Sequence, residues 1–317
     1  MDQKKEYVEI LPREGNLYKA NLHTHSTFSD GSFSPEQLKA MYMAEDYSVL
    51  AFTDHRKFVP HTDLCDKDFV ALTSAELDFN LYDEKGLVTK VVHINSVSPE
   101  PYFEASYERM PYEIGLINGT VADLRQKGHF VTLNHPNWSN MSNEDVLAVK
   151  GVDAIEIFNS IGTVFNNYGD DSPIYEYALR CGERAIPVAG DDTHKIFEDG
   201  TPFMEYYQSF TMIKAKALSY ESIFDALKNG RCYASTGPIF ENIWLEGNKL
   251  CVECSPVFGV YVHSKYISRK AQDVRPTDCI THTAIDISAI REVSPYIWVQ
   301  LRDTNGKKAW AMPYWFE

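Results

Sequence analysis

Residues 21–31 read NLHTHSTFSDG, and they place three side chains that can bind a metal at the end of a short apolar run. His23 and His25 are separated by one residue, so on an extended strand both imidazoles point to the same face. Asp30 follows five residues after the second histidine. Taken alone, each of these residues is more often structural, so the rest of the chain decides whether they form a site.

The segment after this stretch predicts a helix, and strands and helices alternate through about residue 235. In SPEQLKAMYMAEDY, Ser34 is the expected N-cap, Pro35 the first helical residue and Gln37 the partner that completes a capping box. Further strands are predicted for SVLAFTDH, FVALTSAELDF, VVHINSV, HFVTLNHP, VDAIEIFNS and AIPVAGDDTH, and further helices for YEIGLINGTVADLRQKG, SPIYEYALRCGE and YESIFDALKNG. This alternation is typical of an α/β domain.

Helical patterns largely disappear after Gly237–Pro238. The segment YIWVQLRDTNGKKAWAMPYWF predicts a hairpin around Asn305–Gly306. We therefore expect an α/β domain over residues 1–237 and a small β-rich accessory domain over residues 238–317. Whether the accessory domain covers the first domain, shapes its pocket or mediates assembly is left open.

The composition bounds the class of protein. The chain has 317 residues, enough for one barrel-sized domain and an appendage, and a formal net charge of -15. Binding to nucleic acid or to an anionic membrane needs a basic face, so neither partner is expected. The first residues lack the apolar core of a secretory signal, and the longest apolar runs are far shorter than a membrane span. We expect a cytoplasmic protein.

The six cysteines are scattered and do not form a dense disulfide framework, so we expect reduced thiols. Cys251 and Cys254 form a C-x-x-C pair, and Cys279 with His282 forms C-x-x-H, which together could imitate a structural zinc site. However, NKLCVECSP predicts a strand, on which an odd separation points the two thiols to opposite faces. Ordinary thiols are the favoured interpretation.

Metal-capable side chains recur at or near the ends of the predicted strands. They are His23, His25, His55, Glu76, His93, His135, Asp192 and His194. In a parallel barrel the carboxyl ends of all strands meet at one face, so these residues are expected to form one basin. Imidazoles and carboxylates without a thiolate suit zinc, manganese or iron, and a carboxylate such as Glu76 can bridge two ions.

The motifs HTHSTFSDG, TDH, AELDF, HINSV, NHP and DDTH stand in this order over residues 18–238, and they resemble the PHP (polymerase and histidinol phosphatase) family of metallohydrolases. The resemblance implies a distorted (β/α)7 TIM-like barrel that holds two to three divalent metal ions (Zn, Mn or Fe). The later segments DALKNGRCYASTGP and SPYIWVQLRDTNGKKAWAMP are similar to the CehA/McbA-like branch. The name of that branch implies carbamate and amide hydrolysis, whereas the wider family mostly cleaves phosphoesters.

The resemblance also implies how nine ligands would divide among three ions, a trinuclear centre. One ion would take His23, His25, Glu76 and Asp192, a second Glu76, His93 and His135, and a third Asp30, His55 and His194. Asp30 stands where the family usually has histidine, a variation that the family allows.

A hydroxide held between two ions that share Glu76 is the expected nucleophile. The expected catalytic residues are Glu76, Asp192, His194 and Arg231. Arg231 is the favoured candidate for binding phosphate oxygens because it follows a helix, at the expected top of the barrel; Arg56 and Lys195 are weaker candidates. Each arginine or lysine could equally be a surface charge, and Glu156 and Asn159 could support the ligands or be ordinary strand residues.

The sequence therefore predicts a metal-dependent hydrolase. The leading hypothesis is a phosphoesterase for a small phosphorylated metabolite or nucleotide. The alternatives are a CehA/McbA-like carbamate, amide or ester hydrolase, and a non-catalytic regulatory PHP module. The expected partner is a small-molecule phosphoester, and oligomerisation is left open.

Overall fold

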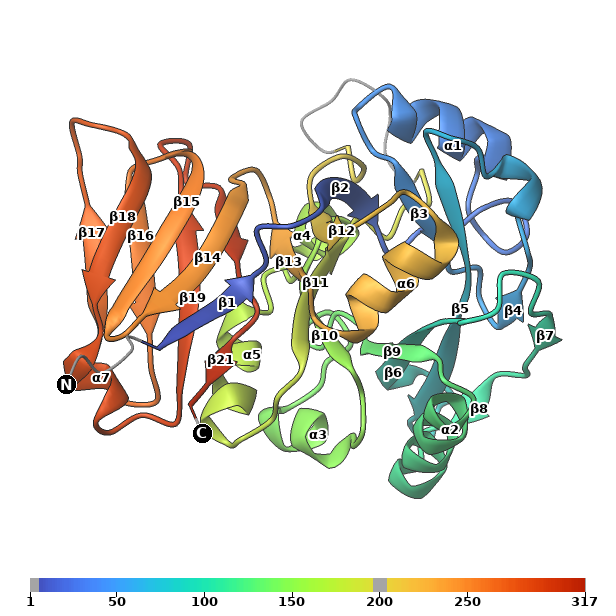
Figure 1. The fold of residues 1–317 in the computed structure, drawn as a ribbon. Coiled ribbons are helices and arrows are strands. Elements are labelled where there is room, and N and C mark those ends of the chain that lie inside the picture. Colours follow the sequence, from blue (N-terminus) through green and yellow to red (C-terminus); the bar gives the residue numbers. More distant parts are fainter. Residues whose placement is uncertain (1–5, 196–203, 317) are drawn as a thin grey trace.

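The structure, a computed structural model, describes residues 6–195 and 204–316. Within them, most strands belong to one large mixed sheet. Its strands follow one another in the order β11 (Ile186–Gly190), β10 (Ala154–Asn159), β9 (Phe130–Leu133), β6 (Val88–Val97), β5 (Val70–Tyr82), β3 (Val49–Phe52), β2 (Asn16–Asn21), β12 (Phe210–Ala215), β13 (Cys232–Ser235), β20 (Lys308–Trp310), β19 (Tyr296–Arg302), β16 (Gly259–His263) and β17 (Ala271–Val274). Figure 1 shows an N-terminal α/β part beside a block of C-terminal strands.

Seven α-helices lie within the described residues. They are α1 (Pro35–Met43), α2 (Ile114–Gln126), α3 (Asn143–Ala148), α4 (Ser160–Asn166), α5 (Ser172–Arg180), α6 (Tyr220–Lys228) and α7 (Ser288–Arg291). The predicted capping box of α1 is confirmed: the backbone N–H of Gln37 donates to the Ser34 hydroxyl, and that of Ser34 donates to the Gln37 side chain. Helix α6 buries Ile223, Ala226 and Leu227 in an apolar cluster with residues of the sheet.

The strands that carry the candidate ligands are not all parallel. β2, β3 and β5 run parallel to one another, as do β9, β10 and β11, but β6 is antiparallel to both of its neighbours. β5 and β6 form a hairpin whose turn is closed by Asp83, which accepts hydrogen bonds from the N–H groups of Lys85 and Leu87. His93 therefore lies within β6, opposite Asp78 of β5, and not at a carboxyl end.

The resemblance implies a closed (β/α)7 barrel, and what the described residues show is a mixed α/β fold with a large sheet. Within residues 6–195 and 204–316 no ladder joins β11 to β2. A single bridge between Thr24 and Thr193, just after these two strands, brings their carboxyl ends together. The closed barrel stays a prediction.

The C-terminal strands form two layers. β14 (Phe240–Glu246), β15 (Lys249–Val257) and β18 (Ile280–Asp286) make a second sheet, which the N-terminal strand β1 (Tyr7–Leu11) completes by pairing with β14. In Figure 1, β1 lies against this block. The predicted hairpin at Asn305–Gly306 is confirmed as β19–β20, and β20 pairs with β13, so one sheet runs through both parts. The domain boundary near Gly237–Pro238 stays a prediction.

All six cysteines are free thiols. Cys251 and Cys254 are both buried on β15. No group of metal-capable side chains found in the described part of the chain includes a cysteine. Across the same residues, no helix is long and apolar enough to cross a membrane.

The segment after β11 is held in place by Asp191, which is fully buried. Its carboxylate accepts five hydrogen bonds from three separate segments. The donors are the hydroxyls of Tyr42 and Ser160 and the backbone N–H groups of Tyr207, Gln208 and Ser209. Burial raises the pKa of Asp191 to about 6, although these hydrogen bonds oppose the rise. This carboxylate ties the end of β11 to α1, α4 and the start of β12.

Replacing this carboxylate should destabilise the fold. Asp191→Ala leaves five donors, three buried and two partly buried, without this acceptor, and each such loss at a buried donor costs about 1–3 kcal/mol. We expect the free energy of unfolding to fall by at least about 3 kcal/mol, measured by urea denaturation in the presence of a chelator. Asp191→Asn, which keeps one acceptor oxygen, should lose less. Equal stability of the alanine variant and the wild type would contradict the role given to Asp191.

Candidate metal centre

Four candidate ligands come from the segments that follow β2 and β11. The N–H of His25 donates to the carbonyl of Thr193 at 3.1 Å, and the N–H of Asp192 donates to the carbonyl of His23 at 2.9 Å. These backbone hydrogen bonds set His23 and His25 beside Asp192 and His194. The expectation that strand ends bring distant ligands together holds for this pair of strands.

Glu76, on β5, lies at the centre of the cluster and is 1% exposed. Its two carboxylate oxygens contact five imidazoles, which come from four different segments. The distances are 3.2 Å to His23 Nε2, 3.1 Å to His93 Nδ1 and 3.4 Å to His135 Nε2 from Oε1, and 3.3 Å to His25 Nε2 and 3.3 Å to His55 Nδ1 from Oε2.

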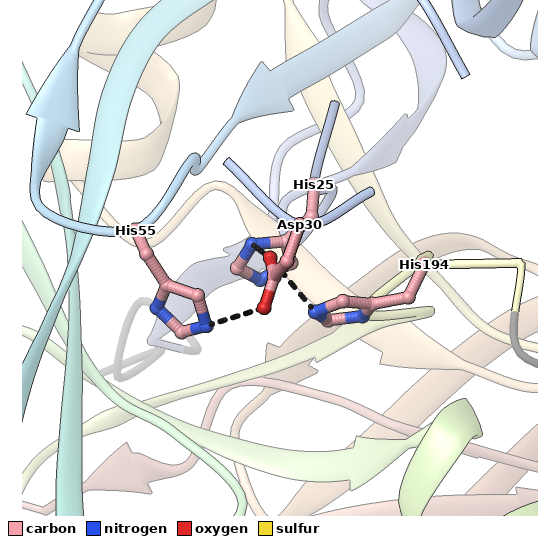
Figure 2. A group of neighbouring side chains, drawn as sticks. All are labelled: His25, Asp30, His55 and His194. Carbon is pink, nitrogen blue, oxygen red and sulfur yellow. Dashed lines mark ion pairs between the residues drawn. The ribbon is translucent and has the colours of Figure 1, made fainter. Parts of the chain in front are cut away.

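A second set of ligands surrounds Asp30, as Figure 2 shows. The Asp30 carboxylate lies 3.5 Å from nitrogens of His25, His55 and His194. The Asp30 side chain is 56% exposed, whereas His25 is fully buried. This set therefore forms the solvent-facing edge of the cluster.

The side chains form three overlapping groups in which the potential ligand atoms lie within 4.8 Å of one another. The groups are His23, Glu76 and His135; His23, His25 and Asp192; and His25, Asp30, His55 and His194. His93 belongs to none of these groups, although it contacts Glu76. All nine candidate ligands thus lie in one cluster, with His23 and His25 each shared between two groups.

Glu156 and Asn159, on β10, support the candidate ligands. Glu156 Oε1 lies 3.1 Å from His23 Nδ1, and its Oε2 accepts from the N–H of His135 at 3.0 Å. Asn159 donates to Asp192 at 3.2 Å and to Glu156 at 3.1 Å. A contact between Glu156 and His23 Nδ1 orients the ring so that Nε2 points at Glu76 and Asp192.

Gly190 allows this close approach. A Cβ atom at this position would lie 2.6 Å from His23 Cβ and 2.9 Å from Glu156 Oε1. Both neighbours belong to the cluster and are held by other contacts, so a larger residue has no room. Glycine at the end of β11 is therefore a requirement of the site.

Three residues of the site have positive φ angles although they are not glycine. They are Arg56 (61°), His135 (24°) and Asp192 (57°). Such conformations are uncommon in residues with a Cβ, and they persist where the surrounding structure enforces them. Two of the three are candidate ligands, and the third directly follows His55.

The charges of the buried ligands shift their pKa values in opposite directions. Burial alone would lower the pKa of His25, but the carboxylates of Asp192 and Glu76, 3.1 and 3.3 Å from its Nε2, raise it to about 10. For the carboxylates the effects are reversed. Burial alone would raise the pKa values of Glu76 and Asp192, but the surrounding histidines hold both pKa values well below their ordinary range. The two carboxylates are therefore anionic at neutral pH.

The donor atoms of this cluster fit divalent metal ions. His23 Nε2, His25 Nε2, His55 Nδ1 and Asp192 Oδ1 are buried and have no hydrogen-bond partner. Buried polar atoms of this kind normally find a partner, so four of them aimed into one cluster fit the binding of a cation. Imidazole nitrogens and carboxylate oxygens are the donors that zinc, manganese and iron accept.

The structure does not bring Arg231 to the candidate ligands. Arg231 precedes β13 and forms an ion pair with Asp225. Its carbonyl accepts from the N–H of Lys214, which pairs with Leu17 near the start of β2. His23 is six residues further along, so roughly 20 Å separates the two at about 3.3 Å per residue. The reason is topological: β13 runs parallel to β2, and a residue that precedes it lies at the opposite end from the ligands.

The two other cation candidates lie closer to the cluster. Lys195 follows His194, and its Nζ lies 4.8 Å from the centre of the Phe33 ring. Arg56 follows His55 and donates to Asp78. Asp78 also accepts from Arg109, a residue that the sequence analysis did not consider.

Sequence reasoning also missed Asn134 and Trp138. Asn134 donates to Glu76 Oε1 at 2.7 Å. The half-buried Trp138 ring lies 5.0 Å from the His135 ring and 6.0 Å from the His93 ring, measured between centroids. Both residues flank His135 in the segment NHPNW, and their adjacency to that motif was the available signal.

Metal binding should release protons. With a pKa of about 10, His25 carries a proton at pH 8, whereas a histidine ligand must be neutral. Binding of Mn²⁺ at pH 8 should therefore expel about one proton or more per chain, and affinity should fall as the pH falls from 8 to 6. Titration calorimetry in two buffers of different ionisation enthalpy measures this release. Identical heats in both buffers would contradict it.

No family model and no curated protein matches this chain. Among solved structures, it is similar to a two-domain protein from Bacteroides vulgatus that contains a predicted PHP-like metal-dependent phosphoesterase, with 15% identity and a TM-score of 0.48 over 100% of this chain and 99% of that one.

Two further solved structures are similar over a smaller part. One, from Bifidobacterium adolescentis, is described as a putative metal-dependent phosphoesterase (13% identity, TM-score 0.41, 60% of this chain and 91% of that one). The other is an amidohydrolase from Chromobacterium violaceum with bound sulfate and no metal (14% identity, TM-score 0.41, 58% and 93%). Identities and TM-scores of this size assign no substrate to this chain. The CehA/McbA-like branch stays a prediction.

Proposed function

We propose that this chain is a metal-dependent hydrolase, and that its substrate is a small phosphorylated metabolite or nucleotide. The observation that supports the proposal is the cluster of imidazoles and carboxylates around Glu76, in three overlapping groups. A structural zinc site is usually one closed set of four ligands, whereas a catalytic site keeps an open side. The half-exposed Asp30 places the open side of this cluster at the Asp30 edge.

We propose that the site binds three divalent ions, which would be zinc, manganese or iron. One would be held by His23, His25, Glu76 and Asp192, a second by Glu76, His93 and His135, and a third by Asp30, His55 and His194, all within the cluster that the three overlapping groups form. Divalent ions at such positions supply Lewis acidity and lower the pKa of water. Glu76 would be shared by two of the sites, which makes those two sites interdependent.

The protein's own residues contribute orientation. Glu156 holds the ring of His23 through Nδ1, and Asn159 holds Asp192. His194 Nδ1 lies 2.8 Å from the backbone carbonyl of Asp192, which leaves Nε2 directed at Asp30. Fixing each ligand from behind in this way keeps the geometry of the site independent of the substrate.

The fold proposal follows the same line. The bridge between Thr24 and Thr193 supports a distorted (β/α)7 barrel that closes between β2 and β11 at the end where the ligands lie. Residues 238–317 would form a β-rich accessory domain. The enzyme would be cytoplasmic, and its binding partner would be a small phosphoester.

A substrate screen tests the reaction class. The metal-loaded protein is assayed with phenyl phosphate, a cyclic phosphodiester and an aryl carbamate. The proposal expects turnover of one of the phosphate esters. Turnover of the carbamate alone would support the CehA/McbA-like alternative, and turnover of none by a fully loaded protein would support a non-catalytic module.

The chain should bind about three metal ions, none of them through its cysteines. Elemental analysis of the purified, metal-loaded protein gives the number per chain. The double variant Cys251→Ser, Cys254→Ser is the control, because both thiols are buried on β15, outside the three ligand groups. Loss of one zinc equivalent in this variant would show that the thiols bind metal.

Replacing Glu76 should abolish catalysis. Glu76→Gln keeps the size of the side chain but removes the charge that five histidines contact. We expect kcat to fall by at least about a thousandfold, the scale at which a central electrostatic element acts, and the metal content to drop. Asp153→Asn is a matched control, because Asp153 is a largely buried carboxylate that precedes β10, at the other end of the sheet. A folded Glu76→Gln protein with near wild-type turnover would exclude the shared-carboxylate mechanism.

A further inference from the structure

Two arginines converge on one buried carboxylate beside the candidate metal centre. Asp78 is 1% exposed, and it accepts from Nη1 of Arg56 and from Nε of Arg109. We name Arg56 and Arg109 the rim arginines. The side chains of both reach solvent, Arg56 at 27% and Arg109 at 54% exposure.

The position of Asp78 fixes the rim arginines beside the ligands. Glu76 and Asp78 are separated by one residue on β5, so their side chains point to the same face about 7 Å apart. Asp78 also lies opposite His93 in the antiparallel ladder with β6. The carboxylate that holds the rim arginines is therefore one step along β5 from the carboxylate at the centre of the cluster.

The backbone at Arg56 brings it to this place. Successive residues of an extended chain point to opposite faces, yet His55 contacts Glu76 and Arg56 contacts Asp78. The positive φ of Arg56, 61°, turns the chain so that both side chains reach the same face of β5. This uncommon backbone conformation places the Arg56 guanidinium next to a candidate ligand.

The charges leave a local positive surplus. One buried carboxylate needs one cation for compensation, and here it has two, in a chain whose formal net charge is -15. Arg109 bonds Asp78 through Nε, so its terminal nitrogens belong to the half-exposed part of the side chain, near the Tyr82 hydroxyl. A planar guanidinium held at one edge is suited to bind a carboxylate or a phosphate with its other edge.

We propose that the rim arginines bind a second anionic group of the substrate, a carboxylate or a phosphate, one strand step from the group that is hydrolysed. This inference rests on the proposed function and narrows it to small phosphate esters that carry a further anion. It also explains how an acidic chain attracts an anionic substrate. Half-buried Trp138, beside His93 and His135, offers a flat wall for the part of the substrate between its two anions.

The molecule contains a matched control for the rim arginines. At the other end of the sheet, Arg125 and Lys228 share Asp153, with nitrogen to oxygen distances of 3.3 and 3.0 Å. The Arg125 side chain is 45% exposed and that of Asp153 is 10% exposed, so the arrangement resembles that of Arg109 and Asp78. Arg125 is remote from the ligands, because Asp153 precedes β10, whereas Asn159 at the far end of β10 contacts Asp192.

The test measures binding, not turnover. Titration calorimetry with the metal-loaded protein compares phosphonates with and without a carboxylate at the far end: phosphonoacetate against methylphosphonate, 3-phosphonopropionate against propylphosphonate, and 4-phosphonobenzoate against phenylphosphonate. We expect at least one carboxylate-bearing member to bind about tenfold or more tightly than its partner. Arg109→Met should abolish this preference, Arg109→Lys should keep part of it, and Arg125→Met should leave it unchanged. Elemental analysis checks that each variant holds the wild-type metal content.

The outcomes separate the inference from the proposed function. No preference for any carboxylate-bearing phosphonate in the wild type, absence of all binding, or a preference that survives in Arg109→Met would overturn the role of the rim arginines. A protein with the expected binding pattern that hydrolyses no phosphate ester would keep the rim arginines as an anion site and reject the proposed reaction. A protein that hydrolyses phenyl phosphate but binds both members of each phosphonate pair with equal affinity would keep the proposed reaction and reject the anion site at the rim arginines.

Discussion

The contact of one buried carboxylate, Glu76, with five histidines is the constraint on which the site depends. A buried charge is costly unless it is paired, and here the partners come from β6 and from the segments after β2, β3 and β9. Assembling these histidines around Glu76 also requires uncommon backbone features, namely positive φ angles at His135 and Asp192 and a glycine at position 190. Divalent ions would compensate the buried polar atoms that no protein group satisfies.

Two consecutive aspartates show how the same chemical group takes different roles in this fold. Asp191 accepts five hydrogen bonds from protein donors and ties three segments together. Asp192, the next residue, has a buried Oδ1 without a hydrogen-bond partner, and it lies beside His23 and His25. The first carboxylate is satisfied by protein donors, so it is structural; the second has an oxygen free to face the candidate ligands. The site therefore rests directly on the hydrogen bonds that hold the end of β11.

Cations are arranged differently at the two ends of the α/β part. At the ligand end, Arg56 and Arg109 share Asp78 one strand step from Glu76. At the other end, Arg231 pairs with Asp225, which is largely exposed, and lies away from the nine candidate ligands. Similar ion pairs can therefore differ in role. One beside the ligand cluster can help to bind a substrate anion, whereas one far from the cluster is an ordinary pair of surface charges. A surface ion pair such as that of Arg231 contributes little to stability.

Local patterns in the sequence predicted many of the elements and the candidate ligands that the fold brings into one cluster. The capping box at Ser34, the hairpin at Asn305–Gly306 and the ordered histidine and carboxylate motifs are local patterns, and local patterns are set by neighbouring residues. Periodicity could not give the direction of β6, because alternation looks the same in parallel and antiparallel strands. It also could not give the end of the sheet at which Arg231 lies, or the pairing of Arg109 with Asp78, which are 31 residues apart. Those features depend on which strands lie side by side, and only the tertiary structure decides that.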